Sequence, residues 1–324
     1  MTSTPADIAL AAERLRQGRV VAFPTETVYG LGADALSQAA VRRVFALKDR
    51  PANNPLIVHV ADAAMAARCV HAWPTSAQAL ADAFWPGPLS IVLPKASSIP
   101  SIVTASGPNV AVRCPDHPVA LALLAAFGSP LVGPSANRSG SISPTCAAHV
   151  RGVWTEDDVF ILDGGPCRIG IESTVISLAG ATPRVLRPGM ITPHDLARVL
   201  GQGVTFDDAP AAPNAANAPL DSPGRLLSHY APAADAILVA RESLEASLTH
   251  GCACLLIDAD PPPGVLCLRM PSDPQAYAAA LYDALRRADA ERPTRIIIER
   301  PPAAPDDQRW AAILDRLTRA CAPR

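Results

Sequence analysis

Apolar residues follow two different spacings along the first part of the chain, and each spacing predicts one kind of element. From Ile8 to Leu15 they recur at helical spacing, after Thr4-Pro5, a hydroxyl residue and a proline that are typical of a helix start. The four consecutive apolar residues Val20–Phe23 then indicate a buried strand. We therefore expect a helix followed directly by a strand.

The same two patterns continue to about residue 200 and predict an interleaved series of strands and helices. Apolar runs predict strands at 56–60, 89–93, 110–113, 131–133, 159–162 and 175–178. Amphipathic segments predict a helix that begins after Ser37 and further helices at 62–71, 76–84, 117–127, 144–151 and 193–200. Interleaving of this kind is typical of an α/β fold.

The last part of the chain alternates more regularly. Strands are predicted at 236–240, 253–257, 265–269 and 294–298, with helices at 242–250, 273–289 and 307–319, which is typical of a small parallel α/β domain. Residues 207–219 read DDAPAAPNAANAP, and this small, proline-rich composition indicates a linker or a mobile loop. We therefore divide the 324 residues into a first domain (1–206), a linker (207–232) and a second domain (233–324).

Composition and charge narrow the function classes. Apolar residues make up 49% and charged residues 18% of the chain, which excludes a disordered protein. A net charge of −2 argues against a strongly basic surface for polyanions, while a local basic pocket stays open. The eight cysteines include no C-x-x-C pair, which favours reduced thiols and a cytoplasmic protein. No apolar run reaches the ~18 residues of a membrane span, so we expect no contact with a membrane.

Five segments could carry chemistry, and the first is the hydroxyl-rich stretch Pro24–Ala35. It contains G-x-G-x-x-A, the pattern of a dinucleotide-binding turn, but six residues separate Phe23 from Gly30, whereas that turn needs its first glycine at the strand end. This spacing disfavours an NAD-dependent oxidoreductase. We expect a loop at a strand end, either a structural loop or one whose glycines let the backbone approach a ligand closely.

The second segment places Lys48, one of only two lysines, beside Arg50 at the end of a predicted helix. Cations at a helix C-terminus complement its dipole, and the same pair would also clamp a polyphosphate, so both interpretations stay open. His59, in an apolar strand, taken singly indicates a core histidine. Arg113, at another strand end, could be a surface charge.

The third segment, Gly133–Pro144, runs from a strand through a small polar loop toward the helix predicted at 144–151. With Ser143 as its cap, the N-terminus of that helix would suit an anion, although a serine-rich turn that only caps the helix is the alternative. Residues 164–175 and 185–189 could be simple turns and strand ends. No G-x-x-x-x-G-K-[ST] phosphate loop occurs in the chain.

Taken together, the segments resemble the threonylcarbamoyl-AMP synthases, whose catalytic domain is called YrdC-like. The motifs that carry the resemblance are P-T-E-T-V-Y-G-L-G (24–32), K-x-R-P-x-x-N-P-L-I-V-H-V (48–60), F-W-P-G-P-L-S (84–90), V-A-V-R (110–113), P-S-A-N-x-S-G (134–140), G-I-E-S-T-V (170–175) and L-R-P-G (186–189). S-P-G (222–224) and H-Y-A-P (229–232), with about 90 residues after them, resemble the two-domain form. The resemblance implies an open twisted α/β sheet around a basic cavity, and a small Rossmann-like parallel α/β domain after it.

The resemblance also implies an activity. ATP, L-threonine and bicarbonate would give threonylcarbamoyl-AMP and pyrophosphate, the first step of N6-threonylcarbamoyladenosine formation in tRNA. Mg²⁺ would accompany ATP, with no metal ligand assigned to a protein side chain. The expected partner is the downstream tRNA threonylcarbamoyl transferase complex, with at most a weak contact to tRNA itself. An RNA-binding module of a tRNA-processing pathway is the alternative from another class.

Residue roles follow from the resemblance position by position. Lys48 and Arg50 are the expected catalytic residues. The expected ATP site consists of Lys48, Arg50, Asn54, Ser135, Asn137, Ser143, Arg187, His229 and Tyr230. Threonine and bicarbonate would be surrounded by Thr27, His59, Arg113 and Ser173. His229 and Tyr230 are further expected to fold over the cavity as part of a lid that excludes water.

Overall fold

A computed structural model describes residues 3–206, 229–257, 265–301 and 307–323. Residues 3–206 form a larger unit around one sheet, and the described residues from 233 onward form a smaller unit around a second sheet. Residues 229–232 lie between these two units. Most of the expected linker, residues 207–228, lies outside the described residues.

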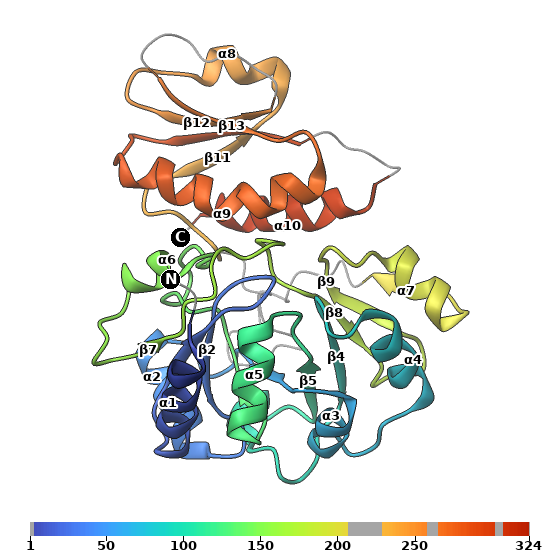
Figure 1. The fold of residues 1–324 in the computed structure, drawn as a ribbon. Coiled ribbons are helices and arrows are strands. Elements are labelled where there is room, and N and C mark those ends of the chain that lie inside the picture. The colour runs from blue at the N-terminus through green and yellow to red at the C-terminus, as the bar shows by residue number, and fades with distance from the viewer. Residues whose placement is uncertain (1–2, 207–228, 258–264, 302–306, 324) are drawn as a thin grey trace.

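The larger unit is a mixed sheet covered by helices (Figure 1). Its helices are α1 (Pro5–Arg16), α2 (Gln38–Lys48), α3 (Ala63–Cys69), α4 (Thr75–Phe84), α5 (Pro118–Phe127), α6 (Ala147–Arg151) and α7 (Pro193–Leu200), with a 3-10 turn, η1 (Ser101–Thr104). Its strands are β1 (Val21–Phe23), β2 (Gly30–Asp34), β3 (Ile57–His59), β4 (Leu89–Pro94), β5 (Asn109–Arg113), β6 (Leu131–Val132), β7 (Phe160–Ile161), β8 (Thr174–Ser177), β9 (Arg184–Arg187) and β10 (Thr205–Phe206). They lie in the order β10-β9-β8-β4-β5-β3-β6-β2-β1-β7.

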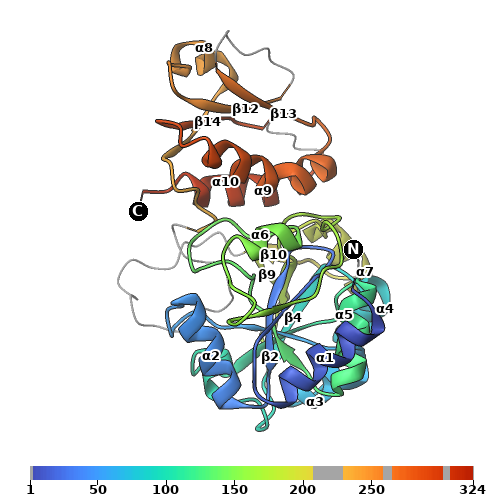
Figure 2. The same cartoon turned by 60° about the vertical axis from the view of Figure 1, so that its left-hand side comes forward.

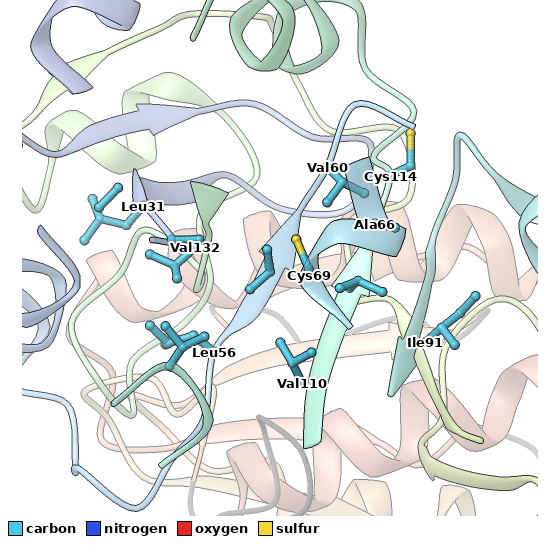
Figure 3. Close-up of a cluster of buried hydrophobic side chains, with 14 of the residues drawn as sticks. Leu31, Leu56, Val60, Ala66, Cys69, Ile91, Val110, Cys114 and Val132 are labelled. Carbon is cyan, nitrogen blue, oxygen red and sulfur yellow. The ribbon is translucent and has the colours of Figure 1, made fainter. Parts of the chain in front are cut away.

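Local sequence signals explain where the first helices begin. The Thr4 hydroxyl accepts the main-chain N–H of Asp7, while the Asp7 carboxylate accepts the main-chain N–H of Thr4, which forms a capping box at α1. Ser37 caps α2 in the expected position. Most buried apolar side chains of the larger unit belong to one cluster (Figure 3), which includes Leu31, Leu56, Val60, Ile91, Val110 and Val132.

The glycine-rich stretch after β1 is a strand where we expected a loop. β2 pairs antiparallel with β1, with Gly30 opposite Phe23 and Gly32 opposite Val21. A Cβ atom at Gly30 would lie 2.9 Å from the Phe23 ring, so the glycines are needed to make room for that ring. Because these glycines lie inside a strand and open no helix, the dinucleotide-binding pattern has no structural counterpart.

Two other local expectations were wrong. The helix expected at 144–151 begins only at Ala147, after Cys146, and the Ser143 hydroxyl donates to Glu172 instead of capping the helix. Ser143 therefore does not cap this helix, and its expected contact with ATP remains a prediction. The segment 185–189, expected as a turn or a strand end, contains the end of β9, and β10 is a strand that we did not predict.

The smaller unit confirms the expected parallel α/β alternation. Its strands are β11 (Ala236–Val239), β12 (Ala253–Ile257), β13 (Leu266–Met270) and β14 (Ile296–Glu299), all parallel and in the order β11-β14-β12-β13. Its helices are α8 (Leu244–Ser247), preceded by a 3-10 turn, η2 (Arg241–Ser243), α9 (Pro274–Ala290) and α10 (Arg309–Ala320). Both ribbon views place α9 and α10 between the small sheet and the larger unit (Figures 1 and 2). Within the described residues, every helix is too short or too polar to cross a membrane.

The two units share an apolar interface. Val28, Ile142 and Ile171 of the larger unit belong to the same buried cluster as side chains of α9 and α10. Gly170 lies close against α9, because a Cβ atom there would lie 2.4 Å from the carbonyl oxygen of Ala278. The smaller unit is therefore packed directly on the loops that follow β1, β6 and β7.

Candidate active site

One cavity brings most of the expected site residues together. It lies where loops and strand ends of the larger unit meet residues 229 and 230. Polar and charged side chains from seven separate segments line it, namely Thr25, Thr27, Arg50, His59, Arg113, Ser135, Glu172, Arg187, His229 and Tyr230. Segments that are far apart in sequence thus converge on a single site.

Lys48 lies directly behind the cavity wall. It is the last residue of α2, is 1% exposed, and its ammonium donates hydrogen bonds to the main-chain carbonyls of Ser135 and Asn137. Burial, with a smaller contribution from the nearby Arg50 charge, lowers the pKa of Lys48 well below its ordinary value. The ammonium does not cap its own helix, so the helix-dipole interpretation does not explain this lysine.

Arg50 reaches the cavity from the turn after α2. Its guanidinium donates to both oxygens of Asn54, at 3.1 Å for the main-chain oxygen and 2.7 Å for the side-chain oxygen, and to the Pro55 carbonyl at 2.8 Å. Burial lowers its pKa to about 10. Asn54 therefore orients Arg50 and does not itself line the cavity. Among the described residues, neither Lys48 nor Arg50 forms an ion pair with a carboxylate.

Another part of the wall contains a buried ion pair and a histidine. Arg113 at the end of β5 is buried, and its Nη2 lies 2.7 Å from Oε1 of Glu26, so it is not a surface charge. His59 at the end of β3 packs edge-on against the Phe23 ring, with ring centroids 5.4 Å apart. Burial and the charge of Arg113 lower the pKa of His59 well below its ordinary value, so this imidazole is neutral at physiological pH.

Hydroxyl groups of this wall are held in fixed positions. The Thr27 hydroxyl lies 2.9 Å from that of Thr25, which in turn donates to the Val28 carbonyl at 2.7 Å. Arg187 donates to the main-chain and side-chain oxygens of Ser173, both at 3.1 Å, and burial lowers its pKa. Arg187 therefore lines the cavity, while Ser173 supports it from behind.

His229 and Tyr230 line the cavity from the segment between the two units. Tyr230 has a φ of 62° and is 1% exposed, and its ring stacks on that of Tyr282 with centroids 5.6 Å apart. The His229 ring packs edge-on against Tyr230 at 4.1 Å. Burial lowers the pKa of His229 to about 3 and raises that of Tyr230 to about 12, so both rings are neutral at physiological pH.

Several expected site residues support the cavity without lining it. The Asn137 side chain donates to the carbonyls of Arg138 and Ser141, both at 2.7 Å, and holds the loop that contains Ser135. Residues of this supporting group are Lys48, Asn54, Asn137, Ser143 and Ser173. Their expected roles remain predictions, since the structure establishes only their positions.

Glu172 is a cavity residue that we did not predict. Its Oε1 accepts the Ser143 hydroxyl at 2.7 Å, and its Oε2 accepts the Tyr282 hydroxyl at 2.9 Å and Nε of Arg316 at 3.0 Å. Burial raises its pKa, but the nearby arginines and these hydrogen bonds outweigh burial and hold the pKa below its ordinary value. A lone acidic residue inside the apolar stretch 169–176 was the sequence signal for this position.

The arrangement suits a reaction of several anions. Lys48 and Arg50 supply positive charge anchored by uncharged oxygen atoms, so this charge is not cancelled locally. His59 and the threonine hydroxyls supply neutral donors and acceptors on the same cavity. The described residues contain no group of three or more His, Cys, Asp or Glu side chains that could hold a metal ion.

Comparison with known proteins gives matches over nearly the whole chain. Residues 13–189 match the family model described as Telomere recombination, and residues 191–322 match that of the Threonylcarbamoyl-AMP synthase C-terminal domain. The chain is 39% identical to the threonylcarbamoyl-AMP synthase of Bacillus subtilis, over 100% of this chain and 95% of that protein. It is 44% identical to the corresponding Pyrococcus abyssi protein, over 72% of this chain and 67% of that one. The crystal structure of P. abyssi Sua5 complexed with L-threonine superposes with a TM-score of 0.89 at 35% identity, over 99% of this chain and 96% of that chain.

Proposed function

The chain belongs to the threonylcarbamoyl-AMP synthase family, and we propose that its cavity joins L-threonine, bicarbonate and ATP into threonylcarbamoyl-AMP and pyrophosphate. This is the first step of N6-threonylcarbamoyladenosine formation in tRNA. The observation that carries the proposal is the pair Lys48 and Arg50, two buried cations at one cavity that are anchored by carbonyl and amide oxygens.

The reaction requires two bond-forming steps. The neutral amine of threonine attacks the carbon of bicarbonate, and loss of water leaves a carbamate. A carbamate oxygen then attacks the α-phosphorus of ATP in line and displaces pyrophosphate. Threonine, bicarbonate and ATP all carry negative charge, so their mutual repulsion is the main obstacle, and fixed cations and donors are the groups that the site needs most.

The phosphate groups of ATP fit the side of the cavity that contains Arg50 and Ser135. Lys48 lies behind Ser135, and two of its three N–H donors are already used by carbonyls, which leaves one for a phosphate oxygen. Arg50 is held as a planar fork by Asn54 and Pro55, a geometry that suits phosphate oxygens. Arg187 adds a third cation at the same cavity.

Threonine and bicarbonate fit the side formed by Thr27, His59 and Arg113. A neutral His59 can accept a proton or a hydrogen bond from the reacting amine without adding charge. Arg113 offers a cation whose charge is shared with Glu26, which suits a small carboxylate better than a triphosphate. Ser173 accepts hydrogen bonds from Arg187 and would hold this arginine in place.

Mg²⁺ is expected to enter with ATP. The carboxylate that lines the cavity, Glu172, already accepts three hydrogen bonds with its two oxygens. Phosphate oxygens and water would therefore provide the coordination, as is common for this ion. The ion would neutralise charge on the triphosphate and leave Lys48 and Arg50 free to contact the remaining oxygens.

His229 and Tyr230 would shield the product. A mixed carbamic–phosphoric anhydride is hydrolysed readily, and two neutral buried rings over the cavity exclude water. We expect the shielded product to pass to the tRNA threonylcarbamoyl transferase complex that consumes it.

Pyrophosphate release with single omissions tests the proposal. We expect release to require threonine, bicarbonate and ATP together, with threonylcarbamoyl-AMP detected by mass spectrometry in the complete mixture. Release that proceeds equally well without threonine or without bicarbonate would show that the cavity performs another reaction.

A further inference from the structure

We propose that Tyr282 on α9 and Arg316 on α10 are positioning residues of the active site, which hold the Glu172 carboxylate in the cavity wall and support the Tyr230 ring. The inference rests on the proposed function of the cavity. It gives the smaller unit an indirect part in the reaction, since none of its described residues from 233 onward lines the cavity.

The first observation is the way in which Glu172 is held. Tyr282 and Arg316 lie 110 and 144 residues from Glu172 in sequence, yet both bind the same carboxylate oxygen. Nη2 of Arg316 also donates to the main-chain oxygen of Glu172 at 3.2 Å. The smaller unit thus fixes the side chain and the backbone of this residue, whose remaining oxygen is bound by Ser143.

The second observation is that the same two side chains support Tyr230. Its ring stacks on Tyr282 at an interplanar angle of 28°, and the Arg316 guanidinium lies 5.7 Å from its ring centroid. Tyr230 has a positive φ, which is uncommon for a residue with a side chain and needs support from its surroundings. Tyr282 and Arg316 therefore fix two residues that line the cavity, Glu172 and Tyr230.

Simple cohesion between the two units does not require this arrangement. The apolar cluster around Ile142, Ile171 and Leu281 already joins them. Arg316 is 0% exposed, and a buried arginine that binds a carboxylate seldom adds stability over apolar packing. A pair of this kind is better explained by the position and charge that it gives Glu172.

The charge of Glu172 depends on groups from every element around it. These groups are Arg316 and Asp315 on α10, Tyr282 on α9, Arg187 on β9, and His229 and Tyr230. Without the Arg316 cation, burial would act against the ionised carboxylate, and Glu172 would take up a proton at a higher pH than in the wild type. A cavity that needs the ionised form then loses activity at the acidic end of its pH range.

Two tyrosines of α9 provide a matched pair of variants. Tyr282 and Tyr277 are both fully buried, but the Tyr277 hydroxyl has no hydrogen-bond partner among the described residues, while that of Tyr282 donates to Glu172. We expect Tyr282→Phe to lower kcat/KM for ATP roughly tenfold, the typical value of a hydrogen bond to a charged group, and to move the acid limb of the pH profile upward. Tyr277→Phe should change neither.

Arg316 variants test the charge separately. In Arg316→Met, the acid limb of the pH profile should move further toward neutral pH than in Tyr282→Phe. Arg316→Lys keeps the positive charge, so its acid limb should lie closer to the wild-type position. Arg309→Met on the same helix is the control, because Arg309 is paired with Asp307 away from the cavity. Thermal unfolding of every full-length variant shows which of them are folded.

The outcomes separate this inference from the proposed function. Equal rates and pH profiles for Tyr282→Phe and Tyr277→Phe would overturn the positioning role, as would an Arg316→Lys profile identical to that of a folded Arg316→Met. A wild-type protein that releases no pyrophosphate with all three substrates would instead overturn the proposed function.

Discussion

The buried ammonium of Lys48 provides the sharpest test of the charge argument. Lys48→Met keeps most of the aliphatic stem and removes the charge together with the hydrogen bonds to Ser135 and Asn137. We expect turnover to fall by about 10²–10³-fold, the typical loss when one preorganised donor to developing charge is removed, which corresponds to about 2.7–4 kcal/mol.

Stability should fall by less than the lost hydrogen bonds suggest. Each carbonyl left without a donor costs about 1–3 kcal/mol, but the variant no longer has to bury an ammonium. The lowered pKa of Lys48 shows that its burial is unfavourable. We therefore expect a net loss of roughly 1–3 kcal/mol in the free energy of unfolding, which leaves the protein folded at assay temperature.

The second lysine of the chain is the control. Nζ of Lys95 donates to the Ile99 carbonyl at 2.9 Å and lies outside the cavity, so Lys95→Met removes the same chemical group from a site without substrate. Pyrophosphate release and thermal unfolding are measured for both variants. Near-wild-type turnover in a folded Lys48→Met protein, equal to that of Lys95→Met, would refute the reasoning.

Two further predictions concern the cation and the interface between the units. Burial and the Arg50 charge lower the pKa of Lys48, so this lysine loses its positive charge at a lower pH than an ordinary lysine. ATP affinity, measured by calorimetry, should therefore weaken as the pH rises through the lowered pKa of Lys48. An equal pH slope in Lys48→Met would contradict this assignment. Gly170→Ala should lower both the unfolding temperature and pyrophosphate release by more than Gly165→Ala. Both glycines have a φ of 80°, but only a Cβ atom at Gly170 would meet α9. Equal effects of the two substitutions would mean that the contact between Gly170 and α9 is unimportant.

Local sequence signals predicted most helices and strands correctly. The start of α1 depends on Thr4, Pro5 and Asp7, which are neighbours in sequence, so its cap could be identified without the fold. β2 could not be identified in the same way, since the reason for its glycines is the Phe23 ring on the paired strand. A glycine pattern alone does not distinguish close packing inside a protein from close approach to a ligand.

The roles of charged residues depended even more on distant partners. From the sequence, Lys48 could equally complement the dipole of its helix or bind an anion. The structure decides against the helix dipole, because the ammonium donates to main-chain carbonyls 87 and 89 residues away. Glu172 was not predicted, because the two residues that hold its charge come from the smaller unit. The family resemblance supplied the candidate positions, and only the fold shows which of them line the cavity and which support it.

Positive and negative charges of the cavity are compensated in different ways, and this difference matters for anionic substrates. Lys48 and Arg50 are held by neutral oxygen atoms, so their charge stays available. Glu172 would repel the same substrates and compete for Arg187 if its charge were unmatched, but Arg316 pairs with it from the smaller unit. Under the proposed function, Arg316 thus offsets the charge of Glu172 from behind the cavity wall. At a pH where Glu172 stays ionised without this partner, loss of Arg316 should weaken ATP binding even where Lys48 and Arg50 are intact.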